Sequence, residues 1–250
     1  MRFIVREIKA KSVLTKSGIP GIDYCINPYV GCFHGCRYCY ATFMKRFTGH
    51  QEPWGSFVDV KINAPAILKK QLARARRGNV LISSVTDGYQ PIEVKYKLTR
   101  QCLEVLLECQ FPVDILTKSP LVLRDMDIMK KFKEIEVGLT ITTDNENMRK
   151  VFEPHAPHVS ERMKALKTLH NHGIKTYAFI GPVLPMNPDA LSEKLSPYVD
   201  SVIIDRMNYT SKTVSIYKRL NLDRWLDNKF VDAIIEKLKD GFAGKTVDIC

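Results

Sequence analysis

The chain has 250 residues, a length that favours one large domain or two small ones. Apolar residues make up 45% and charged residues 26%, values that argue against a disordered chain and a disulfide miniprotein. No apolar run approaches the roughly 18 residues that a membrane-spanning helix needs, and the N-terminus lacks the apolar stretch of a signal peptide. We therefore expect a cytoplasmic protein with no membrane partner.

Charge is unevenly distributed along the chain, whose formal net charge is +11. Residues 1–100 contain 17 basic and 6 acidic side chains, whereas residues 101–250 contain 21 of each, so the whole excess lies in the first two fifths. Two interpretations stay open at this point. The excess is either a solvated basic face or a surface that attracts a polyanion such as nucleic acid.

Short apolar runs alternate with amphipathic stretches along the sequence. The runs are nearly continuously apolar, as expected for parallel strands that helices cover. The expected strands are 23–30, 79–85, 113–118, 136–143, 175–181 and 200–207. The expected helices are 64–77, 98–110, 121–133, 158–172, 189–198 and 224–240. Six strands followed by helices predict one continuous α/β unit, and the periodicity fits a doubly wound sheet and a partial β/α barrel equally well.

Seven cysteines, an odd number in a chain without a secretion signal, argue against a disulfide framework. Cys102 and Cys109 lie seven residues apart on one apolar helical face, which predicts that both are small core side chains. Cys32, Cys36 and Cys39 differ, because they form a C-x3-C-x2-C motif directly after the first expected strand. Thiolates so closely spaced favour a soft metal centre, either zinc or an iron–sulfur cluster.

The number of thiolates helps to distinguish the two kinds of centre. A structural zinc site normally has four ligands, and the only nearby candidates for a fourth are His34, inside the motif, and Cys25 upstream. A cubane cluster with three cysteine ligands keeps one iron open for another molecule. Gly31 and Gly35 allow the loop to wrap closely around such a cluster. The motif therefore favours an iron–sulfur site, with zinc as the alternative.

The cysteine triplet, with Tyr38 before its last member, resembles the radical S-adenosylmethionine (SAM) superfamily. The segments INPYVGCFHGCRYCYATFM, SSVTDGYQPIE, ILTKSPLVLRD and FEPHAP resemble the spore photoproduct lyase-like branch, also called DNA-repair photolyase-like. The resemblance runs from about residue 10 to residue 207. It implies a partial (β/α)6 TIM-like barrel over residues 22–210, with a basic N-terminal extension over 1–21 and a C-terminal helical segment over 211–250.

The resemblance also implies the chemistry. Cys32, Cys36 and Cys39 would bind a [4Fe–4S] cluster, and SAM would chelate the fourth iron. Electron transfer from the reduced cluster would cleave SAM to a 5′-deoxyadenosyl radical, which takes a hydrogen atom from the substrate. Such an enzyme needs a reductant such as a flavodoxin or ferredoxin.

Further residues match positions that contact SAM or substrate in the superfamily. The expected cofactor-binding residues are Tyr38, Ser84, Thr86, Asp87, Lys118, Thr140, Thr142, Ile180 and Gly181. The side-chain oxygens of Ser84, Thr86 and Asp87 would accept hydrogen bonds from the SAM amino group, and Lys118 would form an ion pair with the SAM carboxylate. The threonines would contact the ribose, while Tyr38, Ile180 and Gly181 would line the adenine. Lys118 and Arg206 are the expected catalytic residues, with Arg206 facing the substrate.

Several of these residues also have a purely structural interpretation. Asp87 could cap the turn that Gly88 begins, Tyr38 could be loop packing, and the threonines could be ordinary β-branched strand residues. Arg162, which follows Glu153-Pro154, is interpreted mainly as architectural.

The expected function is a radical SAM reaction on a nucleic acid or nucleotide, with the basic N-terminal region as the candidate contact surface. A peptide or small-metabolite substrate is the alternative, and a non-catalytic zinc-binding module is the second alternative. Spore photoproduct lyase has a cysteine at the end of its second strand that returns a hydrogen atom to the product. The segment 81–87 contains none, which argues against the lyase's own repair reaction.

Overall fold

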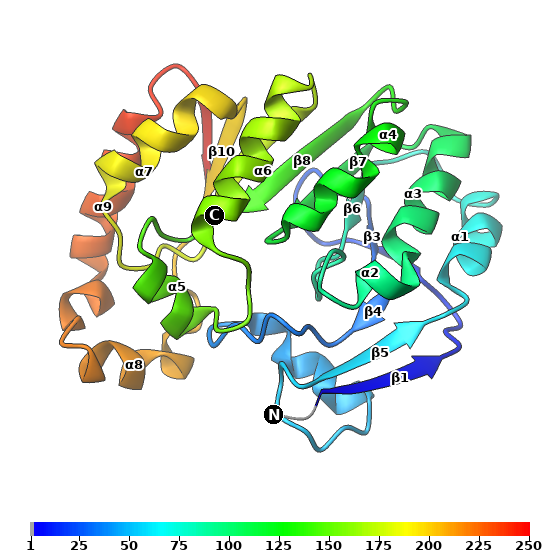
Figure 1. The fold of residues 1–250 in the computed structure, drawn as a ribbon, viewed down its shortest axis with the longest axis horizontal. Coiled ribbons are helices and arrows are strands. Elements are labelled where there is room, and N and C mark those ends of the chain that lie inside the picture. The colour runs from blue at the N-terminus through cyan, green and yellow to red at the C-terminus, as the bar shows by residue number, and fades with distance from the viewer. Residues whose placement is uncertain (1–2) are drawn as a thin grey trace. The chain divides into compact units, whose positions relative to one another are not determined.

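The computed structural model describes residues 3–250, and the chain divides into two compact units (Figure 1). The first unit comprises Met1–Gly35 and Ala41–Val137, and the second comprises Cys36–Tyr40 and Gly138–Cys250. The predicted segment boundaries at residues 21 and 210 stay a prediction, and residues 1 and 2 of the predicted N-terminal extension lie outside the described residues.

The first unit contains a small sheet in which β5 pairs with β1 in parallel and with β4 in the antiparallel sense. Their bounds are β1 Ile4–Ile8, β4 Tyr29–Val30 and β5 Phe57–Lys61. Tyr29, Phe33, Val58, Val60 and Leu98 form a buried cluster on this sheet. Because the cysteine motif begins directly after β4, this packing fixes the point at which the motif leaves the sheet.

A second group of strands in the first unit is mostly parallel: β3, β6 and β7 run in one direction, and β2 is antiparallel to β3. The bounds are β2 Leu14–Lys16, β3 Tyr24–Ile26, β6 Val80–Ile82 and β7 Val113–Thr117. The helices are η1 Tyr40–Phe47, which begins in the second unit, α1 Ala64–Leu72, α2 Glu93–Tyr96, α3 Leu98–Cys109, η2 Pro120–Asp125 and α4 Met126–Met129. Parallel strands bring the residues that follow β6 and β7 to one edge.

The second unit repeats the α/β pattern, with β9, β10 and β11 paired in parallel. The strands are β8 Ile135–Thr140, which begins in the first unit, β9 Lys175–Ile180, β10 Ser201–Ile204 and β11 Thr246–Ile249. The helices are α5 Glu146–Phe152, α6 Val159–Asn171, α7 Pro188–Leu195, η3 Ser196–Tyr198, η4 Thr210–Lys212, α8 Val214–Arg219, η5 Asp223–Leu226 and α9 Asn228–Gly241. Figure 1 shows α7 and α9 side by side.

All six expected strands are present, but the first is divided. Residues 23–30 form β3 and β4, which belong to different sheets, and Pro28 between them has no N–H for a continuous ladder. The expected helix over 121–133 is a 3-10 segment followed by the short α4. Cys102 is fully buried as predicted, whereas the prediction for Cys109 is wrong, because this last residue of α3 is exposed.

Within residues 3–250, no helix is both long enough and apolar enough to cross a bilayer.

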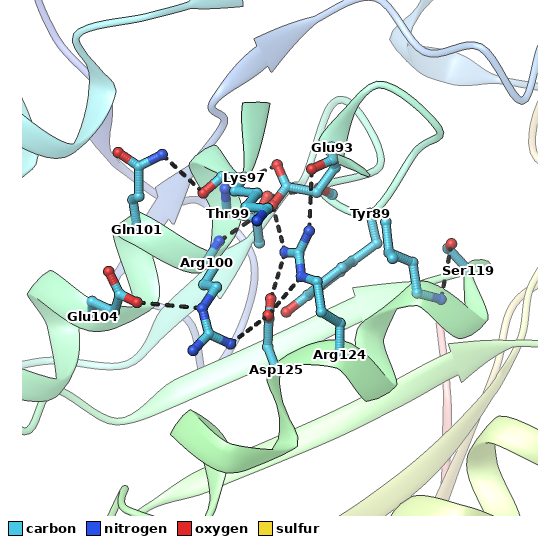
Figure 2. A network of polar contacts seen from close by, with 12 residues as sticks. Tyr89, Glu93, Lys97, Thr99, Arg100, Gln101, Glu104, Ser119, Arg124 and Asp125 are labelled. Carbon is cyan, nitrogen blue, oxygen red and sulfur yellow. Dashed lines mark hydrogen bonds and ion pairs between the residues drawn. The ribbon is translucent and has the colours of Figure 1, made fainter. Parts of the chain in front are cut away.

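A buried ionic network joins α2, α3 and η2 in the first unit (Figure 2). Arg124 donates to Glu93 at 2.7 Å and to Asp125 at 2.7 Å, and Arg100 donates to Asp125 at 3.0 Å. Both carboxylates are fully buried, which an interior tolerates only when cations and hydrogen-bond donors surround them. The Glu93 carboxylate also accepts a hydrogen bond from the backbone N–H of Thr99 at 3.1 Å.

Replacing Asp125 by Ala should lower the free energy of unfolding by about 3 kcal/mol, because two arginines lose their buried partner. Glu108→Ala is the matched control, since Glu108 pairs with Lys69 on the exposed surface and should give no measurable change. Urea unfolding of both variants tests this expectation. Equal stability of the two variants would contradict it.

Candidate metal centre

The cysteine motif forms a tight loop between β4 and η1. The backbone N–H of Gly35 donates to the Cys32 carbonyl at 3.3 Å, and the N–H of Cys39 donates to the Cys36 carbonyl at 3.2 Å. Gly31 introduces the loop with φ +90°, and a side chain at this position would collide with the carbonyl oxygen and ring of Phe57. The close approach therefore requires glycine at residue 31.

Two side chains that follow β6 hold the start of the loop. The Thr86 hydroxyl donates to the Gly31 carbonyl at 2.6 Å. The side-chain amide of Gln90, which is fully buried, donates to the same carbonyl at 3.2 Å and accepts the backbone N–H of Phe33 at 2.9 Å. The Gly31 carbonyl and the Phe33 N–H thus each have a partner.

Asp87 lies at the centre of the site in the first unit. Its carboxylate contacts His34 Nε2 at 3.1 Å, and it accepts from the Thr117 hydroxyl at 2.6 Å, the Lys118 N–H at 2.8 Å and the Tyr89 N–H at 2.9 Å. Because an ionised carboxylate only accepts, Nε2 of His34 carries the proton. Burial raises the pKa of the Asp87 carboxyl, but His34 and the donors from Lys118 and Thr117 outweigh this effect and hold it well below its ordinary value.

These contacts bear on the residues expected to bind SAM. The Thr86 side chain donates a hydrogen bond to the Gly31 carbonyl, and the Asp87 side chain contacts His34. The Ser84 hydroxyl accepts a hydrogen bond from the Asn27 side chain at 3.2 Å. Lys118 is half-buried at the end of β7, with its backbone N–H on Asp87. Contact of these residues with SAM stays a prediction. The structure shows that they lie at one edge and that two of them hold the cysteine loop.

The second unit holds the other end of the loop through a buried carboxylate, Glu153. The Tyr38 hydroxyl donates to Glu153, the Thr142 hydroxyl donates to it at 3.1 Å, and Arg162 pairs with it at 2.5 Å. Arg162 and Glu153 are fully buried, and Arg162 also donates to the Thr140 carbonyl at 3.1 Å. Burial, and then Cys36 and Glu153, raise the pKa of Tyr38 well above its ordinary value, so the phenol stays neutral.

The remaining predicted residues of the second unit occupy two kinds of position. Thr140, Thr142 and Ile180 are buried at the ends of β8 and β9, and a side chain at Gly181 would collide with the ring of Phe179. Arg206 instead forms an ion pair with Asp232 of α9, in which both side chains are about half exposed. Its predicted role toward the substrate stays a prediction, and its position adds no support.

Sequence reasoning did not single out Gln90 or Glu153 as residues that hold the loop. The only signal for Gln90 was a polar residue in the short segment after Asp87-Gly88. His34 was considered as a fourth metal ligand: its Nε2 contacts Asp87, and its buried Nδ1 has no hydrogen-bond partner among the described residues. The loop carries three free thiols, a soft donor set whose number suits a cubane cluster with one open iron.

Stability in acid should depend on Asp87. The folded-state pKa is lowered, so the stabilisation is fully present above the unfolded value of about 3.9 and is lost as the pH falls below it. Asp87→Asn should cost about 2 kcal/mol at pH 7. Between pH 5 and pH 3, the free energy of unfolding should fall more steeply for the wild-type protein than for this variant. Parallel curves in urea titrations would refute this.

The Glu153–Arg162 pair should show strong coupling. Glu153→Leu leaves Arg162 buried without its carboxylate and should lower the free energy of unfolding by about 3–5 kcal/mol. The double variant Glu153→Leu/Arg162→Met should lose much less than the sum of the two single variants. Denaturant unfolding of the four proteins gives this coupling energy. If the double variant instead loses the sum of the two single-variant stability losses, Glu153 and Arg162 are not coupled.

Comparison with known proteins agrees with this geometry. The model of the radical SAM superfamily matches residues 26–195. An uncharacterized protein of Methanocaldococcus jannaschii is 48% identical over 179 residues, which cover 72% of this chain and 67% of that protein.

Solved structures show the same fold. Spore photoproduct lyase complexed with dinucleoside spore photoproduct superposes with a TM-score of 0.72 at 14% identity, covering 98% of this chain and 82% of that one. Streptococcus suis SuiB bound to the precursor peptide SuiA gives a TM-score of 0.61 at 15% identity, covering 90% and 48% of the two chains. The expected fold class, a mostly parallel α/β fold of the radical SAM TIM-barrel type, is confirmed. The chain belongs to the radical SAM superfamily, whose members use a [4Fe–4S] cluster and SAM.

Proposed function

We propose that this protein is a radical SAM enzyme in which Cys32, Cys36 and Cys39 bind the [4Fe–4S] cluster, and that its substrate is a nucleic acid or nucleotide. The observation that carries the proposal is the cysteine loop. Its three thiols lie within eight residues, and buried side chains hold the backbone on which they sit.

When bound, the reduced cluster and SAM supply the 5′-deoxyadenosyl radical that abstracts hydrogen. The protein's own residues position the reactants. Thr86, Asp87 and Gln90 fix the loop, while Ser84 and Lys118 offer a hydroxyl and an ammonium group for the amino and carboxylate groups of SAM. Thr140 and Thr142 of the second unit are proposed to contact the ribose, and Tyr38, Ile180 and Gly181 the adenine.

Two observations support a nucleic acid or nucleotide. Residues 1–100 carry 17 basic and 6 acidic side chains, a balance that attracts a polyanion. The fold is that of spore photoproduct lyase, which was solved with a dinucleoside ligand. The lyase's own reaction is not proposed, because the segment from Leu81 to Asp87 has no cysteine.

A peptide substrate is the second candidate, since SuiB shares the fold and was solved with a precursor peptide. At 14–15% identity the two structural likenesses do not separate these substrates, whereas the positive charge favours the polyanion. A protein reductant, for which a flavodoxin or ferredoxin is suitable, would supply the electron.

Reconstitution with iron and sulfide in the absence of oxygen tests the proposal. The wild-type protein should turn brown, contain about four iron and four sulfide ions, and release 5′-deoxyadenosine from SAM when reduced. Cys36→Ala should lose the cluster and the SAM cleavage together. Cys109→Ala, which alters an exposed cysteine of α3, should retain both.

Substrate class is tested by adding single-stranded oligonucleotides or peptides to the reduced protein. Oligonucleotides should stimulate release of 5′-deoxyadenosine. Stimulation by peptides alone would reject the nucleic-acid part, and a colourless protein with one bound zinc would reject the whole proposal.

A further inference from the structure

The 3-10 helix η1, which begins one residue after Cys39, exposes two aromatic rings. Phe47 is 69% exposed, the largest value among the large apolar side chains of residues 3–250, and Phe43 is 40% exposed. A single exposed apolar residue needs no explanation. Phe43 and Phe47 lie four residues apart on the helix that follows the cysteine motif, and both side chains are exposed. We call Phe43, Arg46 and Phe47 the aromatic face.

A cation lies between the two rings. The guanidinium carbon of Arg46 is 5.4 Å from the ring centroid of Phe43 and 5.0 Å from that of Phe47. In the part of the chain that the structure describes, Arg46 has no ion pair with a carboxylate. Lys45 adds a second positive charge nearby, with its Nζ on the Gln51 carbonyl at 2.9 Å. The aromatic face therefore combines exposed π surfaces with positive charge.

This combination fits one class of macromolecule best. Proteins that bind single strands stack the bases on aromatic side chains and contact the phosphates with Lys or Arg. A duplex hides its base faces within its own stack, so it cannot use the rings. A membrane-surface helix has an apolar face separate from its charged face, whereas Arg46 lies over both exposed rings of η1.

We propose that the aromatic face binds single-stranded nucleic acid, with bases stacked on Phe43 and Phe47 and a phosphate held by Arg46. The inference rests on the proposed function and names a docking surface for its substrate class. Phe43 follows Cys39 by four residues in the sequence.

Fluorescence anisotropy with a labelled single-stranded oligodeoxythymidylate of about 15 nucleotides tests the proposal. The reconstituted protein is used without reductant, so that no SAM is consumed. Phe43→Ala and Phe47→Ala should each weaken binding about tenfold, whereas Phe47→Tyr should keep the affinity because it keeps the ring. Arg46→Ala should also weaken binding and should reduce the slope of log K against log salt by about 0.7.

Arg224→Ala is the matched control. The guanidinium carbon of Arg224 lies 4.0 Å from the ring centroid of Phe230, in the second unit, and Arg224 is not part of the aromatic face. The variant removes a similar cation–aromatic contact and should leave the affinity unchanged. The inference is overturned if the double variant Phe43→Ala/Phe47→Ala, folded by circular dichroism, binds like the wild-type protein. Equal affinity for a duplex of the same length, or displacement of the strand only by an acidic protein, would also overturn it.

Failure of this inference is distinguishable from failure of the proposed function. If oligonucleotides stimulate SAM cleavage while the aromatic-face variants bind the strand with wild-type affinity, this result rejects only the role of the aromatic face and leaves the proposed function standing. A wild-type protein that holds no cluster rejects the proposed function, whatever its affinity for the strand.

Discussion

One buried carboxylate, that of Asp87, determines the arrangement of the first unit around the cysteine loop. Its oxygens contact the His34 ring and accept hydrogen bonds from the backbone N–H of Tyr89. At the end of β7 they also accept from the Thr117 hydroxyl and the Lys118 N–H. An isolated charge in this position would be very costly to bury. Because four donors surround it, the same charge becomes a fixed point that relates the loop to two strand ends.

A second carboxylate serves the second unit in the same way. The Glu153 carboxylate accepts hydrogen bonds from the Tyr38 hydroxyl in the loop and from the Thr142 hydroxyl near the end of β8. It also pairs with the guanidinium of Arg162 in α6. The interpretation of Arg162 as architectural agrees with this position. The two ends of the motif, at His34 and at Tyr38, are therefore each attached to a buried acid by a ring side chain. Between these attachments lies Cys36, with Cys32 and Cys39 just outside them.

Much of this fold follows from the sequence, and the reasons for the exceptions are physical. The parallel strands were predictable because their apolar runs are short and continuous. The metal centre at the three closely spaced thiols stays a prediction. β1 and β5 were missed because their exposed or charged members, such as Arg6 and Asp59, interrupt the pattern. The roles of Gln90 and Glu153 depend on partners 57 and 115 residues away, which no local pattern specifies.

The attachment of the loop through Gly31, Phe33, His34 and Tyr38 has a consequence for damage by oxygen. Iron–sulfur clusters are lost when their sulfurs oxidise. The hydrogen bonds at these four residues are made by the protein's own side chains. We therefore expect these hydrogen bonds to survive loss of the cluster, so that reduced thiols, iron and sulfide restore it without renewed folding.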